Sequence, residues 1–532
     1  MLTPKKCQHG MQLLVSLGLL FLLAVGFFIP INDFHINDTR SYLQSYQKPN
    51  EPNLQKYGEG RDSSEQRYYE TQNCTVEISR TPPDQSQYWE PLEIGYQRNF
   101  WICDFAISVF YEIGATLLSM GEYSLVFMEN SCITELGELV AISRTETIRD
   151  EFDSTIYPRI TDLAGHPNGT LGDIDGDPRI IILLANCANY YTERNELPFD
   201  YSNLCEMIYL HYRIPTMQVF AHEFHHLIWF NNEWDEPQFI LEALAQYAMY
   251  YAGYLEPHNN LAPQVPAYLS HPEDSLLYWN LYNEGGVSSV IDYGSAYLFA
   301  FYIAEKYGVD ILRDLIKEST DGPPGIEAVL QTAGNDIMFN ELYLNWITAL
   351  TIDALGFCNN LYGFENLDAQ ITHYSSVGSL PFLNERIPLR YYGFHIHKIQ
   401  FPTDNITVQI TKSSNETIGI SIASHDAFGW HIYQELHDQE ETLITKNISG
   451  YQIDVAYIIT SYMLNYTPTI IRSDDIGLGP LTHFDISIIP TQTTWQVPWE
   501  LIITLSGICG LFLFITIVFI LSRRNNFEEK IA

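Results

Sequence analysis

The stretch "AHEFHHLIWF", residues 221–230, sets three histidines and a glutamate among apolar neighbours. Its apolar residues and its length predict a buried α-helix over residues 218–230. On such a helix His222 and His226 lie one turn apart on the same face, where they can hold one metal ion together. Glu223 lies beside them and can take a proton from a water molecule bound to that ion.

The alternative for this stretch is a helix whose polar face simply meets water. The apolar flanks argue against it, because at least some of the histidines should be buried, and buried imidazoles need partners. His225 is also one turn from His222, but that pairing would leave Glu223 without its geometric role. We therefore expect His225 to serve packing, the helix surface or a substrate contact.

A metal ion held by two histidines needs a third protein ligand. The segment "DEPQFILEALAQYA", residues 235–248, predicts the next helix, with Glu242 among apolar residues. A buried carboxylate costs free energy unless it is paired or bound to a metal, so Glu242 is the preferred ligand. Asp235 and Glu236 compete with it from the polar turn before the helix, and a structural ion pair is the alternative role for Glu242.

The composition limits the class of protein. With 532 residues, 46% hydrophobic and 17% charged, the chain can form two or three domains with a large core. Its formal net charge of −38 argues against a nucleic-acid partner, which would need clustered lysine and arginine.

Both ends carry apolar runs. Residues 11–29 follow Lys5 and Lys6, a pattern typical of a secretory signal peptide or of an uncleaved signal anchor. Residues 501–521 are uncharged and long enough for a transmembrane helix, and Arg523 and Arg524 after them predict a cytoplasmic tail. These runs predict a cell-membrane protein, single-pass or two-pass, with the bulk of the chain extracellular and the membrane as a partner.

The sequons and the cysteines also favour an extracellular location for the bulk of the chain. N-x-[ST] triplets, the acceptors expected of a glycoprotein, begin at Asn37, Asn73, Asn168, Asn405, Asn415, Asn447 and Asn465. Six cysteines fall between the apolar runs, namely Cys74, Cys103, Cys132, Cys187, Cys205 and Cys358. An even number in an oxidising compartment is compatible with three disulfides.

The secondary structure changes along the chain. The pattern predicts buried strands over residues 123–129 and 178–187. It predicts helices over residues 218–230, 238–255 and 293–308. From about residue 370 the pattern becomes short alternating runs, which predict a β-sandwich between the catalytic part and the membrane.

The two metal-binding segments together resemble the H-E-x-x-H…E arrangement of the gluzincin metallopeptidases. Three further stretches are similar, in the same order, to hyicolysin-like and immune-inhibitor-A-like secreted peptidases: "DEFDSTIYPRITDLAG", "GDIDGDPRIIILL" and "YGSAYLFAFYIAEKYG". The resemblance covers about residues 120–350. It implies zinc ligands at His222, His226 and Glu242 and a general base at Glu223.

The chain also departs from that family. Gluzincin helices often carry N-E-G-x-A-E, whereas this chain has "LEALAQ", with Gln246 in place of the last carboxylate. An amide there still accepts a hydrogen bond but is less basic, which would lower turnover. The family commonly adds a Tyr or His that stabilises the oxyanion, and Tyr293 stands in the matching region, with Tyr297 as the alternative.

A second metal is the less favoured interpretation of "DIDGD", residues 173–177. A Ca²⁺ loop of the EF-hand type needs Gly and Glu where this chain has Pro178 and Leu184. An Asp-Gly turn before the strand explains the stretch, so Zn²⁺ is the expected cofactor and Ca²⁺ the alternative.

The predicted fold class is an α+β zincin-like catalytic domain followed by a β-sandwich domain and a C-terminal transmembrane helix. The ranges are a signal peptide or anchor (1–30), a polar linker or pro-like segment (31–95), a zincin-like metallopeptidase domain (96–365), a β-sandwich (370–495), a transmembrane helix (500–522) and a cytoplasmic tail (523–532). The expected function is a membrane-anchored extracytoplasmic zinc metallopeptidase acting on a protein or peptide. Two alternatives are a catalytically weak or inert surface-binding or adhesion protein on the same fold and a zinc hydrolase of non-peptide substrates.

Overall fold

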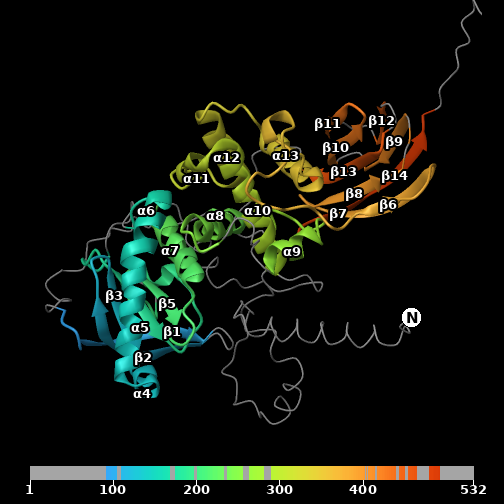
Figure 1. The fold of residues 1–532 in the computed structure, drawn as a ribbon. Helices are drawn as coiled ribbons and strands as arrows, with labels where there is room; N and C mark the ends of the chain where they lie inside the picture. The colour runs from blue at the N-terminus through green and yellow to red at the C-terminus, as the bar shows by residue number, and fades with distance from the viewer. Residues whose placement is uncertain are drawn as a thin grey trace, which may run out of the picture.

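The computed structural model describes residues 92–104, 109–167, 174–196, 200–232, 236–255, 263–280, 289–401, 403, 405–413, 416–438, 442–449, 453–463 and 478–491. A sheet with helices against it forms one end of the molecule, and two further sheets form the other end (Figure 1). A group of helices lies between these ends.

The N-terminal sheet has five strands in sequential order. They are β1 (Gln97–Asp104), β2 (Val109–Met120), β3 (Ser124–Glu129), β4 (Ile180–Ala185) and β5 (Met207–His211). Strands β1 to β3 are antiparallel, and β3, β4 and β5 are parallel.

Strand β4 shows why this part of the sequence forms a sheet. All six residues of "IIILLA" are buried, as expected for a parallel strand that is covered on both faces. Ile182 and Leu184 belong to the core on the helical side of the sheet, whereas Ile181 and Leu183 belong to a second core on the opposite side.

The α-helices are α4 (Asn130–Leu136), α5 (Glu138–Glu151), α6 (Tyr157–Ala164), α7 (Met217–Asn232), α8 (Gln238–Tyr251), α9 (Gln264–Leu269), α10 (Ser289–Tyr307), α11 (Val309–Leu315), α12 (Gly322–Thr332) and α13 (Phe339–Ile352). A π-helical turn (Phe152–Ile156) joins α5 to α6, and 3₁₀ turns occupy Glu193–Glu196 and Cys358–Asn360. Helix α8 lies between α7 and α10 and contacts both. The site residues are carried by these three neighbouring helices.

Two sheets, in which most neighbouring strands are antiparallel, form the C-terminal part. Their strands are β6 (Ser375–Val377), β7 (Phe382–Arg390), β8 (Phe394–Ile399), β9 (Ile406–Thr411), β10 (Thr417–Asp426), β11 (Gly429–His437), β12 (Leu443–Ile448), β13 (Val455–Met463) and β14 (Leu481–Pro490). The strand orders are β11-β10-β13-β8-β6 and β12-β9-β14-β7. Ile420 and Ile458 of the first sheet share a core with Val408 and Ile486 of the second, so the two sheets pack face to face.

The outer face of the first of these sheets packs against helix α13. Tyr457 and Ile459 from β13 belong to the same hydrophobic core as Trp346 from α13. A hydrogen bond of 2.7 Å joins the hydroxyl groups of Thr348 in α13 and Ser421 in β10. The sandwich therefore shares a continuous core with the helices that carry the site.

The predicted fold class is wrong in including a C-terminal transmembrane helix. Within the described ranges, no helix is both long and apolar enough to cross a membrane. The longest of them, α10, has 19 residues and carries Asp292, Glu305 and Lys306. The apolar runs at 11–29 and 501–521, on which the prediction depended, lie outside the described residues.

The cysteine count is compatible with three disulfides, but the described cysteines do not form them. No disulfide joins any two of the described cysteines, namely Cys103, Cys132, Cys187, Cys205 and Cys358. The sixth, Cys74, lies outside the described residues. A count of cysteines cannot show which thiols approach one another, because bonding requires a specific separation and orientation.

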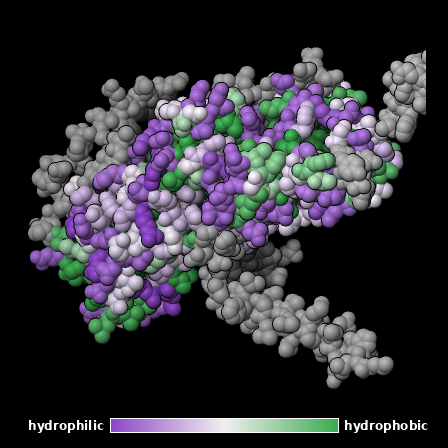
Figure 2. Space-filling view, turned by 45° about the horizontal axis from the view of Figure 1, so that its top comes forward, coloured by the Kyte–Doolittle hydropathy of each residue, from purple (hydrophilic) through white to green (hydrophobic). Residues whose placement is uncertain are grey.

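The surface on one side of the molecule carries both hydrophilic and hydrophobic residues. In the face drawn in Figure 2, hydrophilic residues spread over both ends of the molecule, with smaller hydrophobic patches between them. That distribution fits a chain with 17% charged residues and a net charge of −38.

Candidate metal centre

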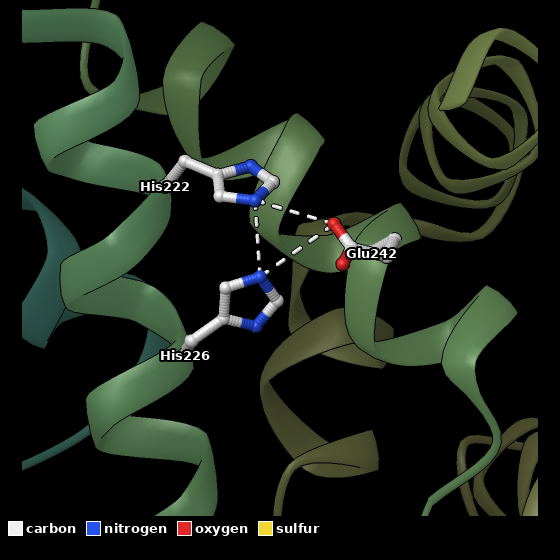
Figure 3. Close-up of side chains that lie close together, drawn as sticks. All are labelled: His222, His226 and Glu242. Carbon is white, nitrogen blue, oxygen red and sulfur yellow. Dashed lines mark hydrogen bonds and ion pairs between the residues drawn. The ribbon is translucent and has the colours of Figure 1, made fainter. Parts of the chain in front are cut away.

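Helix α7 positions the two histidines. It begins at Met217 after a loop, and the Phe220 N–H donates to the carbonyl of Thr216 at 3.0 Å. Its apolar residues pack into the core, and His222 and His226 project from the same side toward α8 (Figure 3). The helical spacing of four residues therefore places both imidazoles on the face that meets Glu242.

His222, His226 and Glu242 form one compact cluster. The Glu242 Oε2 atom lies 3.2 Å from His222 Nε2 and 3.5 Å from His226 Nε2. The two Nε2 atoms are 3.0 Å apart. Among the described residues, this is the group of His, Cys, Asp and Glu side chains whose ligand atoms come close enough together to hold a metal ion.

These separations suit a tetrahedral metal ion. Two ligand atoms that each lie about 2.05 Å from a tetrahedral zinc are about 3.3 Å apart. The observed values of 3.0, 3.2 and 3.5 Å fall on both sides of that separation. Two imidazole nitrogens and one carboxylate oxygen form a donor set that zinc accepts, and a tetrahedral ion keeps a fourth position for water or substrate.

The surroundings of Glu242 favour its charged form. Its side chain is 8% exposed, and burial on its own would raise the pKa of the carboxyl. The nearby His226 and His222 rings outweigh burial and hold the pKa of Glu242 well below its usual range. The other oxygen, Oε1, accepts a 2.8 Å hydrogen bond from Gln238 Nε2, one turn earlier on α8. Oε2 is thereby left facing the two histidines.

Glu223 lies beside the cluster and is held by the backbone. The N–H of Tyr191 donates to Glu223 Oε2 at 2.8 Å, from the segment that bridges to β5 through Tyr190 and Tyr209. Burial raises the pKa of Glu223, while the His222 and His226 rings oppose that shift. A carboxylate with a raised pKa is a stronger base than a free glutamate, which suits a group that accepts a proton from water.

Of the two tyrosine candidates, the structure brings Tyr293 to the site. Its ring centroid is 6.5 Å from that of His222, and its phenol is close enough to Glu242 and Glu223 for their charges to raise its pKa further above the value set by burial. Tyr297, which is 1% exposed, instead packs against Phe301 with ring centroids 5.8 Å apart.

The expectation that His225 serves the helix surface or a substrate contact is wrong. Its side chain is fully buried and packs against the ring of Trp229, with centroids 5.9 Å apart. Neither ring nitrogen has a hydrogen-bond partner, and burial lowers the pKa of His225 well below its usual value. His225 is therefore a neutral core residue, which agrees with the packing role alone.

The competing acidic residues lie elsewhere. Glu236 is buried and accepts a 2.9 Å hydrogen bond from the N–H of Gly322 at the start of α12. Asp235 lies outside the described residues. Gln246, which stands where gluzincin helices often carry a second carboxylate, is buried, and its Oε1 accepts no hydrogen bond.

The described part of the "DIDGD" stretch forms a turn. The Asp177 N–H donates to Asp175 Oδ1 at 2.9 Å, and the Asp177 carboxylate pairs with Arg179 at 2.5 Å. Asp173 lies outside the described residues. Asp177, one of the candidate Ca²⁺ ligands, thus already has a cationic partner.

Sequence reasoning missed three residues that support the site. Gln238 could have been found, because a Gln four residues before a Glu on one helix face is a known pairing. Tyr191 acts through its backbone N–H, which every non-proline residue possesses. The residue type at position 191 therefore gives no indication of this contact. Trp279 packs edge-on against Tyr293 with centroids 4.9 Å apart, a contact made by tertiary folding.

Comparisons with known proteins leave the family open. No protein-family model matches this chain, and no curated protein matches it either. Among solved structures, the pre-peptidase C-terminal domain of a collagenase from Bacillus anthracis aligns over 23% of this chain and 99% of its own, with 10% identity and a TM-score of 0.15. A surface-associated copper-binding protein of Methylomicrobium album BG8, important in copper acquisition, aligns over 22% of this chain and 98% of its own, with 9% identity and a TM-score of 0.17. Scores this low support no conclusion about fold or activity, so the function has to be inferred from the site itself.

Proposed function

We propose that this protein is a zinc-dependent metallopeptidase that hydrolyses peptide bonds in a protein or peptide substrate. The observation that carries the proposal is the convergence of His222, His226 and Glu242 within hydrogen-bonding distances, with Glu223 beside them. The resemblance of their spacing to the gluzincin arrangement supports the same conclusion.

Each residue has a separate role in the proposed reaction. When bound, zinc supplies Lewis-acid activation of a water molecule and of the scissile carbonyl. Glu223 accepts the proton of that water and delivers it to the leaving amine. The Tyr191 N–H holds one oxygen of Glu223 at 2.8 Å, which fixes the direction of the carboxylate before the substrate arrives.

Tyr293 is the proposed donor to the oxyanion. Burial, Glu242 and Glu223 all raise the pKa of its phenol, so the phenol keeps its proton at neutral pH. A neutral hydroxyl group can donate a hydrogen bond to the negative oxygen that develops during attack on the carbonyl.

The decisive experiment compares the full chain with Glu223→Gln. Zinc content is measured by mass spectrometry, and hydrolysis is followed with a library of internally quenched peptides. We expect the variant to keep its zinc and to lose about 10²- to 10⁴-fold in hydrolysis, because the general base is lost and the ligands are intact. Glu327→Gln is the matched control, since Glu327 is a partly buried acid that accepts the Phe339 N–H.

Three outcomes separate the candidate functions. Equal hydrolysis by the parent and Glu223→Gln would rule out the proposed base. A parent that holds zinc but cuts no peptide would favour the alternative of an inert binding protein on this fold. Hydrolysis of ester probes without any peptide cleavage would favour a hydrolase of non-peptide substrates.

We also propose that the bulk of the chain lies outside the cytoplasm. The signal-like N-terminus and the sequons support this location. Two sequon asparagines, Asn405 and Asn447, fall in the described sandwich, and Asn447 is exposed. A mass decrease after glycosidase treatment of protein from the native host would support the location, and absence of any glycan at Asn447 would count against it.

A further inference from the structure

Two buried carboxyl groups lie next to the candidate centre but belong to neither the metal cluster nor the proposed mechanism. Asp292 is in the first turn of α10, and Asp274 is in the segment 271–280 that follows α9. They are 2% and 5% exposed. They lie close enough that the charge of Asp274 raises the pKa of Asp292.

The hydrogen bonds around this pair leave room for one proton between them. Asp292 Oδ2 accepts the N–H of Asn280 at 2.8 Å. The remaining oxygens, Asp292 Oδ1 and Asp274 Oδ2, are buried and receive no hydrogen bond from a donor group. Two carboxylates this close in a low-dielectric interior cannot both be charged, so one of them holds a proton.

The charges nearby decide where that proton is held. Burial and then the charge of Asp274 raise the pKa of Asp292 to about 9. Burial also raises the pKa of Asp274, but Arg390 of β7 opposes that shift, while Glu273 adds to it. Asp292 is therefore the protonated partner at neutral pH and can donate to Asp274.

This pair fastens the segment 271–280 to the helix that carries Tyr293. Trp279, in that segment, packs edge-on against the Tyr293 ring with centroids 4.9 Å apart. On its far side the segment is bound to the sandwich, where Leu276 N–H donates to the Tyr392 carbonyl at 3.1 Å. Tyr293 is the residue after Asp292 and faces His222 at 6.5 Å.

We propose that Asp274 and Asp292 share one proton and so act as positioning residues that hold Tyr293 toward the metal centre. This inference rests on the proposed function for its kinetic consequence. The shared proton joins segment 271–280 to α10, and Trp279 then limits the directions open to the Tyr293 ring. Loss of the proton leaves two charged carboxylates facing each other, which separates the segment from the helix. Among the described residues, the acidic groups that act on the Tyr293 phenol, besides Asp292, are Glu242 and Glu223.

The test compares two substitutions of Asp274 in the full chain. Asp274→Asn keeps the net charge of the singly protonated pair, and its amide can donate to an ionised Asp292 without a shared proton. Asp274→Leu removes the hydrogen bond altogether. The rate constant kcat, KM and zinc content are measured from pH 6 to 10 with the fastest-cleaved quenched peptide, with Glu327→Gln, at a partly buried acid, as the control.

We expect the parent to lose kcat as the pH rises through about 9, the pKa of Asp292. Asp274→Asn should keep the parent kcat at pH 7 and lack that loss at high pH. Asp274→Leu should lower kcat by about 10²-fold at every pH with unchanged KM and zinc content, because a displaced donor costs that much. Parent-like profiles for both variants, or equal losses in both, would overturn the inference.

A second measurement tests the shared proton without relying on hydrolysis. With 4-fluorophenylalanine incorporated at position 293, the ¹⁹F resonance reports the surroundings of the ring directly. We expect it to shift with a midpoint near pH 9 in the Asp274 parent and to stay constant in Asp274→Asn. A constant resonance in both proteins, or the same shift in both, would refute the shared proton. If no peptide is cleaved but the resonance titrates as expected, the peptidase proposal fails while the positioning contact stands.

Discussion

Single residues determine whether the site can hold a metal ion. His222 and His226 can each supply one neutral nitrogen, and Glu242 supplies the only negative charge among the three candidate ligands. The structure places Glu242 so that Oε2 faces both rings, while Gln238 occupies Oε1 at 2.8 Å. The charge and the direction of this one carboxylate should therefore control affinity.

Replacing Glu242 by Gln should weaken zinc binding by more than about 100-fold. The amide keeps the size of the side chain but removes the negative charge that the cation needs. Zinc affinity is measured by competition with a chromogenic chelator. Glu236→Gln is the control, because Glu236 is also buried but contacts α12. An unchanged affinity in Glu242→Gln would remove Glu242 from the ligand set.

Replacing Tyr293 by Phe should lower kcat by about 10²-fold while zinc content stays the same. The phenol is lost as a donor to the oxyanion, but the ring keeps its contact with Trp279. Tyr297→Phe is the matched control on the same helix, one turn away, where the ring packs against Phe301. If the two variants lose activity equally, Tyr293 has no special role.

The candidate site forms only if helices α7, α8 and α10 pack so that the side chains they contribute lie next to one another. Helix α7 contributes two candidate ligands at a spacing of four residues, α8 contributes the third, and α10 contributes Tyr293 beside the buried acid Asp292. The first turn of α10 thus carries a group whose protonation is linked to folding.

Replacing Asp292 by Asn should make stability less dependent on pH. The folded-state pKa of Asp292 is raised to about 9, above its ordinary value of 3.8, so the folded parent binds one more proton than the unfolded chain between those values. This contribution to stability is fully present below pH 3.8 and is lost as the pH rises toward 9. The free energy of unfolding of the parent should thus fall by about 1.4 kcal/mol more per pH unit than that of the variant in this range. Urea unfolding at a series of pH values measures the difference, and equal slopes would contradict it.

At the scale of the whole molecule, the sandwich and the helical part are joined by close backbone contact. A Cβ atom at Gly393, beside β8, would lie 2.2 Å from the carbonyl oxygen of Glu273. The main chain of one part therefore approaches that of the other at a distance that only glycine permits. Asp274, next to Glu273, belongs to the carboxyl pair at α10.

Replacing Gly393 by Ala should lower the free energy of unfolding by about 1–3 kcal/mol, because the backbone oxygen cannot move aside as a flexible side chain would. Gly378→Ala is the control, since a Cβ there has open space. Thermal unfolding monitored by circular dichroism gives the comparison. If Gly393→Ala is as stable as Gly378→Ala, the two backbones can move apart at this contact without loss of free energy of unfolding.

Much of the candidate site could be predicted from the sequence, because its information is local. The spacing of His222 and His226 follows from the helical repeat, and an acid among apolar residues identified Glu242. The transmembrane part of the fold prediction was wrong for the described residues. For His225, the packing role agrees with its burial, whereas the helix-surface and substrate-contact roles were wrong. Helix periodicity indicates which residues share a face, but it does not tell which face another helix will cover.

The residue types of the candidate ligands, their spacing on α7 and the strand character of Ile180–Ala185 could all be predicted from local sequence. Tertiary packing determines that Oε2 of Glu242 meets both rings, that Tyr191 holds Glu223, and that Asp274 lies near Asp292. These contacts join residues far apart in the chain. Their distances depend on how the helices, the loops and the sandwich pack into one core, which no short stretch of sequence specifies.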